Sequence, residues 1–157
     1  FADASFEVLA RSIISKIPDF YEVKSFRIID ERRKNALGKL VNVAEATAKV
    51  VIDGKEYNEI SEGSGPVDAL ARAIKKAVSK KYPEVNQVSL IDYKVRIMQA
   101  EKGTGAITRV QIESKDKQNN RFNTIGVSSN ILDASFNALN DSLIYQIIKT
   151  HHKTKKP

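Results

Sequence analysis

Gly63, Ser64, Gly65 and Pro66, followed by Asp68, are the residues whose types and spacing best suit contact with a small ligand. Glycines let the backbone approach a ligand closely, and free N–H groups at the start of a helix can hold a carboxylate or a phosphate. The carboxylate of Asp68 could bind an amino group. The same residues also fit a simple turn from a strand into a helix, with Asp68 favouring the positive helix end, and the two uses are compatible.

Other ligand and catalytic chemistry finds little support in the sequence. The patterns G-x-G-x-x-G and G-x-x-x-x-G-K-[ST] are missing, which argues against a nucleotide site. His151 and His152, the two histidines, lie among lysines without a cluster of carboxylates, so they predict neither a metal site nor a Ser/His/Asp triad. The lack of cysteine excludes disulfides, thiolate metal sites and cysteine nucleophiles. We therefore expect no catalytic set, no metal site and no cofactor in this chain.

Length and composition predict one soluble domain with a substantial core, since the 157 residues are 41% apolar and 29% charged. No apolar run approaches the roughly 18 residues that a membrane span needs, and no signal peptide is visible. We therefore expect a cytoplasmic protein without membrane contact. The sequence begins at Phe1 rather than at a methionine, so we expect a piece of a longer protein.

The net charge of +7 invites a nucleic-acid interpretation, but the distribution of the charge argues against it. Four of the lysines that supply it lie at the C-terminal end: Lys149, Lys153, Lys155 and Lys156. We interpret residues 151–157 as a basic tail, which is more often a solvated end than a binding arm. A nucleic-acid-binding module is kept as a rival hypothesis that rests on charge alone.

In the first half of the chain, apolar residues at helical spacing predict a helix over 3–17 that Pro18 ends. Alternation over 40–52 predicts a strand, and Asp53-Gly54 predicts a tight hairpin turn after it. Further strands are predicted at 21–32 and 55–61. A helix follows with Pro66 in its first turn, where a missing N–H is harmless. Its predicted buried stripe is Val67, Leu70, Ala71, Ile74, Ala77 and Val78.

The second half predicts strands at 88–98, 106–113 and 122–127, a loop at Gly103 to Gly105, and a long helix at 131–148. Tyr93 falls on the apolar face of its strand, where a core tyrosine with its hydroxyl at the edge is the common case. The long helix is apolar on two sides, so it needs a partner beyond its own sheet. We interpret that partner as a second copy in a symmetric dimer.

An internal repeat joins these elements, because residues 55–74 align with residues 120–139 at a constant offset of 65 with six identities in 20 positions. Each copy reads as a strand, a Ser/Gly-rich turn and a helix. We therefore predict an α+β fold of two pseudo-symmetric β-β-β-α units, about 20–82 and 86–149, with largely antiparallel sheets after a leading helix. The crevice between the halves is then the expected place for a small ligand.

Four ordered segments of this sequence are similar to a known family. The segments are SEGSGPVDALARAIKKAV, SLIDYKVRI, GTGAITRVQIES and TIGVSSNILDASFNALNDSLIY. Together they resemble the C-terminal regulatory domain of the 2-isopropylmalate synthase and citramalate synthase family, and the DYKVRI and GTGA versions look more like the citramalate synthase branch. The resemblance covers about residues 20–148, and residues 1–19 resemble the end of a linker helix from a catalytic barrel that is absent here.

The resemblance implies regulation of an acyltransferase rather than catalysis by this chain. The parent enzyme would condense acetyl-CoA with a 2-oxo acid, pyruvate for citramalate synthase, at a divalent metal in the barrel. Two regulatory domains would pair as a homodimer, and each would bind the end-product amino acid for feedback inhibition. The implied effector is L-isoleucine, with L-leucine and 2-isopropylmalate synthase as the alternative. A pure dimerisation domain with a vestigial site is a further hypothesis.

By motif position, the resemblance implies a pocket that joins both repeat turns to the strands between them. Its residues would be Gly63, Gly65, Val67, Asp68, Leu90, Tyr93, Ile97, Ala106, Thr108, Val127 and Ser129. Leu90 and Tyr93 have opposite strand parity, so their joint presence requires a bulge or a pocket that wraps an edge. Asn123 and Ser64 depart from the family pattern. The helix around Phe6 to Ile17 would be the lever between pocket and barrel.

Overall fold

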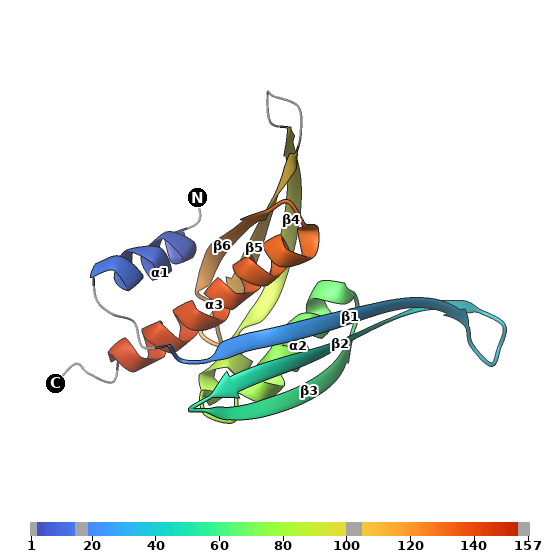
Figure 1. The fold of residues 1–157 in the computed structure, drawn as a ribbon, viewed down its shortest axis with the longest axis horizontal. Helices are drawn as coiled ribbons and strands as arrows, with labels where there is room; N and C mark the ends of the chain where they lie inside the picture. The colour runs from blue at the N-terminus through green and yellow to red at the C-terminus, as the bar shows by residue number, and fades with distance from the viewer. Residues whose placement is uncertain (1–2, 15–18, 100–104, 154–157) are drawn as a thin grey trace. The chain divides into compact units, whose positions relative to one another are not determined.

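The computed structural model describes residues 3–14, 19–99 and 105–153, and by its contacts the chain divides into two units (Figure 1). One unit is Asp19–Pro83, and the other combines Phe1–Pro18 with Glu84–Pro157. Each unit holds a three-stranded antiparallel sheet followed by a helix, with the strands in chain order. The predicted α+β fold of two β-β-β-α units after a leading helix is confirmed.

The first sheet forms around a strand of alternating small apolar and polar residues. β1 (Glu22–Lys34) and β3 (Lys55–Gly63) flank the central β2 (Leu40–Ile52). One side of β2 is buried from Ala44 to the end of the strand: Ala44, Ala46, Ala48, Val50 and Ile52. Asp53 and Gly54 have φ values of 51° and 76°. Positive φ at both central residues is the type I′ geometry that a two-residue hairpin favours, so the predicted turn is confirmed.

Helix α2 (Pro66–Val78) covers the buried side of this sheet through contacts with β2 and β3. Pro66 occupies the first helical turn, as predicted. The buried residues of α2 are Ala69, Leu70, Ala71, Ala73, Ile74, Ala77 and Val78. A short 3₁₀ helix, η1 (Pro83–Gln87), follows.

The second sheet consists of β4 (Ser89–Gln99), β5 (Ala106–Lys115) and β6 (Arg121–Ser128), with β5 in the middle. Helix α3 (Ile131–Lys153) packs on β5 and β6. Leu139, Leu143 and Ile147 of α3 are fully buried against the inner face of this sheet, which carries Val110 and Ile112 of β5.

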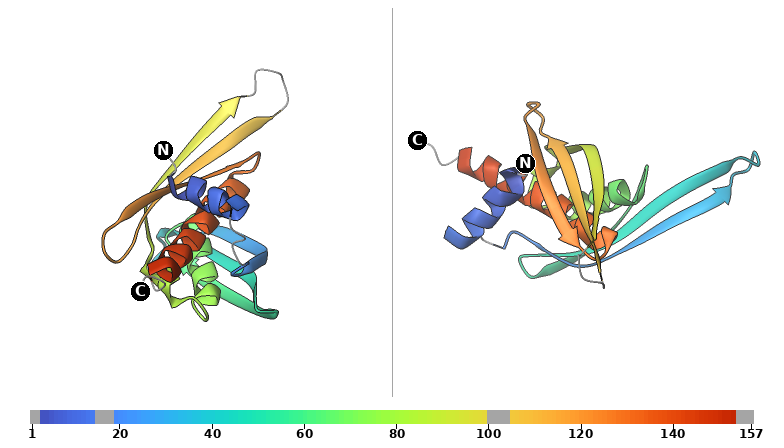
Figure 2. Two further views of the ribbon diagram at one scale, coloured as in Figure 1. Left: turned by 90° about the vertical axis from the view of Figure 1, so that its left-hand side faces the viewer. Right: turned by 90° about the horizontal axis from the view of Figure 1, so that it is seen from above.

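The leading helix α1 (Asp3–Ile14) packs against α3 and β6 of the same unit, and the two helices lie beside each other in all views (Figures 1 and 2). Ala4 of α1 is buried in a small cluster with Val88 and Phe122, against which Tyr145 of α3 packs. The sequence pattern predicts that a second copy of the chain covers the second apolar side of α3. The structure shows that α1 covers part of that side, so the apolar character of α3 alone no longer requires a dimer.

The repeat seen in the sequence is a repeat of structure. α2 begins at Pro66 and α3 at Ile131, which is the predicted offset of 65 residues. The strands before them, β3 and β6, begin at Lys55 and Arg121, one residue away from the same offset. The alignment therefore locates equivalent positions in the two units.

Helix α3 is longer than predicted, because it continues to Lys153 instead of ending near residue 148. His151 therefore lies on a helix and not in a basic tail, and its Nε2 is 3.2 Å from Oε1 of the buried Glu84. The interpretation of residues 151–157 as a tail was wrong in its first three residues.

Some predictions fall outside the described residues, namely the end of the first helix at 15–18, most of the loop at 100–104 and the last residues 154–157. Among the helices that the structure describes, none combines the length and the apolar character needed to cross a membrane.

Candidate functional site

The turn from β3 into α2 holds four of the predicted site residues: Gly63, Gly65, Val67 and Asp68. The carboxylate of Asp68 stabilises this turn. Its Oδ2 accepts hydrogen bonds from the Ser64 N–H (2.9 Å), the Ser64 hydroxyl (3.2 Å) and Arg72 Nε (3.0 Å). Partial burial alone would raise the pKa of Asp68. The bonds from Ser64 and the charge of Arg72 outweigh it, so this pKa lies below its usual value.

The two glycines of the turn meet different surroundings. A Cβ on Gly63 would collide with the backbone nitrogen of Ala69 and lie 2.7 Å from its Cα, so the close approach of α2 to β3 requires glycine there. Gly65 is the N-cap of α2 in an extended conformation, and it offers no side chain to cap the helix. Within the described part of the chain, no heavy atom beyond its chain neighbours lies within 4 Å of the place where its Cβ would be. Packing therefore explains Gly63 but not Gly65.

A bulge at Ile91 brings Leu90 and Tyr93 to the same face of β4. The partners of these two residues on β5 are Ser114 and Ile112, which lie two residues apart, because the register shifts between Leu90 and Asp92. Leu90 and Tyr93 have opposite parity in the sequence, and a bulge was one of the two expected ways in which both could line one pocket. The structure contains this bulge. The shared face is the one that packs on α3, since both partners on β5 are fully buried.

Tyr93 is tied to α3 by its hydroxyl group, which is 2.7 Å from Ser135 Oγ. Ser135 Oγ already donates its hydrogen to the carbonyl of Ile131 at 2.7 Å, so the tyrosine is the donor. The ring is 40% exposed. Tyr93 thus lies on the predicted face with its hydroxyl held, but it is less buried than a core tyrosine.

The remaining predicted residues of this unit divide between the two faces of the sheet. Ile97 pairs with Thr108, and Ala106 follows on the same face of β5, so these three share the side of Tyr93. Val127 instead pairs with Arg109, whose neighbours Thr108 and Val110 are buried, and therefore lies on the opposite face. Ser129 follows β6 in the turn before α3.

The structure therefore gathers the predicted residues into two groups, one in each unit. The first group surrounds the start of α2. The second group lies on the α3-facing side of β4 and β5 and includes Leu90, Tyr93, Ile97, Ala106 and Thr108. Whether these groups bind an effector stays a prediction.

Three supporting residues were missed by the sequence reasoning. Arg72 binds Asp68 at the i,i+4 spacing, which was a readable signal. Asn130 caps α3, since its Oδ1 accepts the N–H groups of Leu132 (2.7 Å) and Asp133 (3.3 Å). An asparagine directly before a helix was also a readable signal. Nothing in the sequence links Ser135 to Tyr93, because 42 residues separate them.

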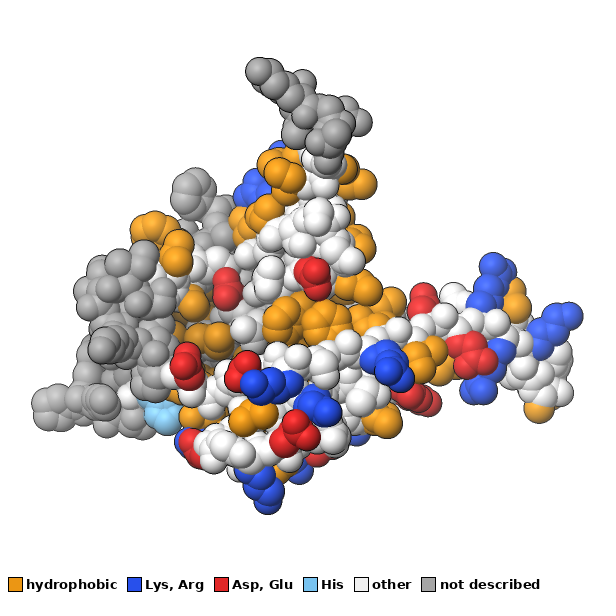
Figure 3. Space-filling view, in the orientation of Figure 1, with side chains coloured by type: hydrophobic (Ala, Val, Ile, Leu, Met, Phe, Trp, Pro, Cys, Tyr) orange, Lys and Arg blue, Asp and Glu red, His pale blue; other side chains and the backbone are white. Residues whose placement is uncertain are grey.

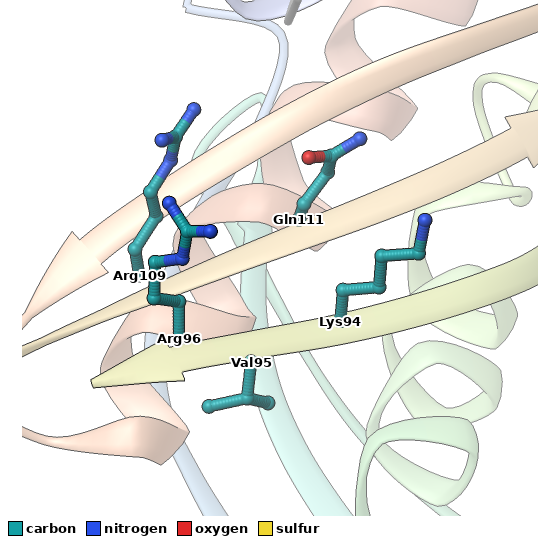
Figure 4. Close-up of a pocket in the computed structure, with 5 residues that line it drawn as sticks. All are labelled: Lys94, Val95, Arg96, Arg109 and Gln111. Carbon is teal, nitrogen blue, oxygen red and sulfur yellow. The ribbon is translucent and has the colours of Figure 1, made fainter.

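Described residues of the unit that contains α3 line two hollows. One of about 210 Å³ is lined by polar residues around Asp116 and Lys149. The other, of about 450 Å³, is lined by Lys94, Val95, Arg96, Arg109 and Gln111 (Figure 4). Neither of these two is lined by a predicted site residue. No three His, Cys, Asp or Glu residues of the described segments lie together in a way that could hold a metal ion.

The sequence of this chain is similar to a known domain family and to parts of larger synthases. Residues 1–147 match the family described as the LeuA allosteric (dimerisation) domain. The chain is 45% identical over 149 residues to an (R)-citramalate synthase of Geobacter sulfurreducens, covering 95% of this chain and 28% of that protein. It is 37% identical over 148 residues to an (R)-citramalate synthase of Aquifex aeolicus, covering 94% of this chain and 27% of that protein. A 2-isopropylmalate synthase of Shewanella frigidimarina is 33% identical over 98 residues, covering 62% of this chain and 17% of that protein. The chain thus spans little more than a quarter of the length of the two citramalate synthases, and its match covers less of the 2-isopropylmalate synthase.

Proposed function

The chain belongs to the family of LeuA allosteric (dimerisation) domains, and we propose that it binds L-isoleucine for feedback inhibition of a citramalate synthase. In this proposal the parent enzyme is a cytoplasmic acyltransferase that condenses acetyl-CoA with pyruvate at a divalent metal, in a barrel domain outside this chain. The greater extent of similarity to citramalate synthases supports isoleucine. L-leucine and a 2-isopropylmalate synthase parent are the alternative.

The observation that carries the proposal is the exposed apolar face at the end of β4. Ile97 is 67% exposed although it lies on the same side of the sheet as the buried core residues. Val95 and Tyr93 precede it on that face, and the Tyr93 hydroxyl is held by Ser135. A branched aliphatic side chain placed against these residues would remove their apolar surface from water, which stabilises the complex.

Taken by itself, each unit has a helix start that could complement the charged end of an amino acid. Gly65 has no side chain with which to cap α2, so the first N–H groups of that helix are open to a carboxylate. Asp68 stands in the same turn with its pKa lowered, so it is ionised at neutral pH and could pair with an ammonium group. Ser129 precedes α3 in the equivalent turn.

A second copy of the chain is part of the proposal. Exposed apolar side chains gather on the α3-facing side of β4 (Figure 3), and further ones lie on the first turn of α3: Tyr93, Val95, Ile97, Ile131 and Leu132. A contiguous apolar surface of this kind marks an interaction site in soluble proteins. A homodimer would cover it and could complete the effector site.

Titration calorimetry of the chain with L-isoleucine and L-leucine tests the proposal. We expect saturable heat with isoleucine and weaker binding of leucine, although the difference is limited to about 1–3 kcal/mol because the two ligands have the same number of carbons. Ile97→Ala should weaken binding at least about tenfold by removing part of the apolar wall.

Ile60→Ala provides the matched control. Ile60 is also an exposed strand isoleucine, 55% exposed, but it lies in the other unit outside the predicted site. Its replacement should leave binding unchanged. Equal weakening by both substitutions would contradict the assigned site. A stable dimer that gives no heat with either amino acid would instead favour a pure dimerisation domain.

A further inference from the structure

The outer face of the second sheet, which is the face turned away from α3, carries a cluster of basic side chains. Lys94 and Arg96 of β4 and Arg109 and Gln111 of β5 project from this face, while Val95 projects from the other (Figure 4). They surround the hollow of about 450 Å³. This volume lies in the range of small-molecule sites in proteins.

The register makes this cluster electrostatically unusual. Arg96 lies directly opposite Arg109, and Lys94 lies directly opposite Gln111. Side chains in directly opposed positions approach within about 5 Å at Cβ, and like charges placed so destabilise a sheet. The repulsion between the two guanidinium groups would be relieved by an anion between them.

The neighbouring acidic residues do not relieve the repulsion between Arg96 and Arg109. Asp92 lies 3.6 Å from Lys94, and Glu113 lies 3.5 Å from Arg121, so each already has a basic partner. Within the described part of the chain, neither Arg96 nor Arg109 forms a salt bridge. The amide of Gln111 donates to Asn123 Oδ1 at 3.2 Å, which holds this side chain beside the arginines.

We propose that Arg96 and Arg109, with Lys94, form a binding site for the phosphate or carboxylate group of a small anionic molecule. Guanidinium groups bind both oxyanions through paired hydrogen bonds, and two of them suit a doubly charged group better than a singly charged one. Phosphate should therefore bind more tightly than acetate. Val127, which pairs with Arg109, lies on this face and is exposed, so an apolar part of the ligand could rest beside the cluster.

This site is separate from the proposed effector site. Tyr93 and Ile97 lie on the face of β4 that packs toward α3, whereas Lys94 and Arg96 lie on the other. The two proposals can therefore fail independently. In particular, isoleucine binding should not require either arginine.

Titration of the chain with inorganic phosphate, pyrophosphate and acetate tests the proposal, at an ionic strength held constant with sodium chloride. We expect saturable binding of phosphate and pyrophosphate that weakens at least about tenfold in Arg96→Gln and in Arg109→Gln, because each substitution removes a charge-assisted pair. In phosphate-free buffer both variants should melt at or above the temperature of the parent, since the repulsion is gone.

Arg32→Gln is the matched control, because Arg32 is an exposed strand arginine of the other unit that pairs with Asn42. It should leave phosphate binding unchanged. Equal weakening in all three variants would indicate general charge screening and overturn the proposal, as would the absence of saturable binding in the parent. Sedimentation of the same samples tests the alternative occupant of this face, which is a second copy of the chain. If the arginine variants lost self-association and kept phosphate binding, the cluster would be an interface between copies.

Discussion

Asp116 shows how one side chain fastens the hairpin between β5 and β6 to α3. Its Oδ1 accepts the N–H groups of Gln118 and Asn120, both at 2.9 Å, and its Oδ2 accepts Lys149 Nζ at 2.7 Å. Burial alone would raise the pKa of this carboxyl. The hydrogen bonds from Lys149 and Asn120 outweigh burial and hold the pKa far below its ordinary value.

Asp116→Asn should lower the free energy of unfolding at pH 7 by about 3 kcal/mol, because it leaves the partly buried Lys149 without its carboxylate. A carboxyl with a depressed pKa in the folded state stabilises the fold above its unfolded pKa, about 3.9, and loses this contribution as the pH falls toward the folded pKa. The difference between parent and variant should therefore shrink as the pH drops from 5 toward 2. Urea unfolding across that range measures it.

Asp53→Asn is the control for this prediction. Asp53 also follows a strand and pairs with a lysine, but its ion pair with Lys81 is exposed. Exposed pairs contribute only about 0–1 kcal/mol, and asparagine tolerates the positive φ of this turn. A loss as large as that of Asp116→Asn would show that the burial argument is wrong.

The elements differ in how closely their helices approach the sheets. A Cβ on Gly126 would collide with the carbonyl oxygen of Ala134 and lie 2.8 Å from the nitrogen of Ala138. The equivalent position in the first unit is Ser61, whose side chain is accommodated beside α2. Helix α3 therefore lies closer to β6 at this position than α2 lies to β3.

Gly126→Ala should destabilise the fold by about 1–3 kcal/mol or more, because backbone atoms of α3 would have to move away from β6. Gly105→Ala is the matched control, since among the residues that the structure describes no heavy atom beyond its chain neighbours lies within 4 Å of its Cβ position. Thermal unfolding of the two variants measures the difference. If Gly126→Ala were as stable as the control, the close helix–sheet packing would not be a constraint.

The elements themselves could be predicted well, because periodicity and turn chemistry are local. The strand over 40–52, its Asp53-Gly54 turn and the start of α2 at Pro66 agree with the prediction residue for residue. The contacts of α1 with α3 could not be predicted, because they join residues more than 100 positions apart. The site was predictable only as a set of motif positions, and the register then placed Val127 on the opposite face from Tyr93.

At the scale of the whole molecule, the proposed feedback inhibition would reach a catalytic domain through α1. Ser5 docks it: its hydroxyl donates to Asp141 Oδ2 of α3 at 2.9 Å and accepts the Ile125 N–H of β6 at 2.8 Å. Burial raises the pKa of Asp141, although the bond from Ser5 opposes the shift. Ser5→Ala removes both bonds and leaves buried polar groups unpaired, which costs about 1–3 kcal/mol of docking.

If isoleucine inhibits a parent enzyme through α1, ligand binding and α1 docking must be coupled, and the coupling must be equal in both directions. Isoleucine should then change the hydrogen-exchange protection of the α1 amides by some factor in the unsubstituted chain. A variant such as Ser5→Ala, in which α1 is largely undocked, should bind isoleucine with an affinity changed by that same factor. The amides of β2, which holds none of the predicted site residues, report on local stability and serve as the internal control. An unchanged affinity in Ser5→Ala, together with isoleucine-dependent protection of α1, would violate this reciprocity and place the signal elsewhere.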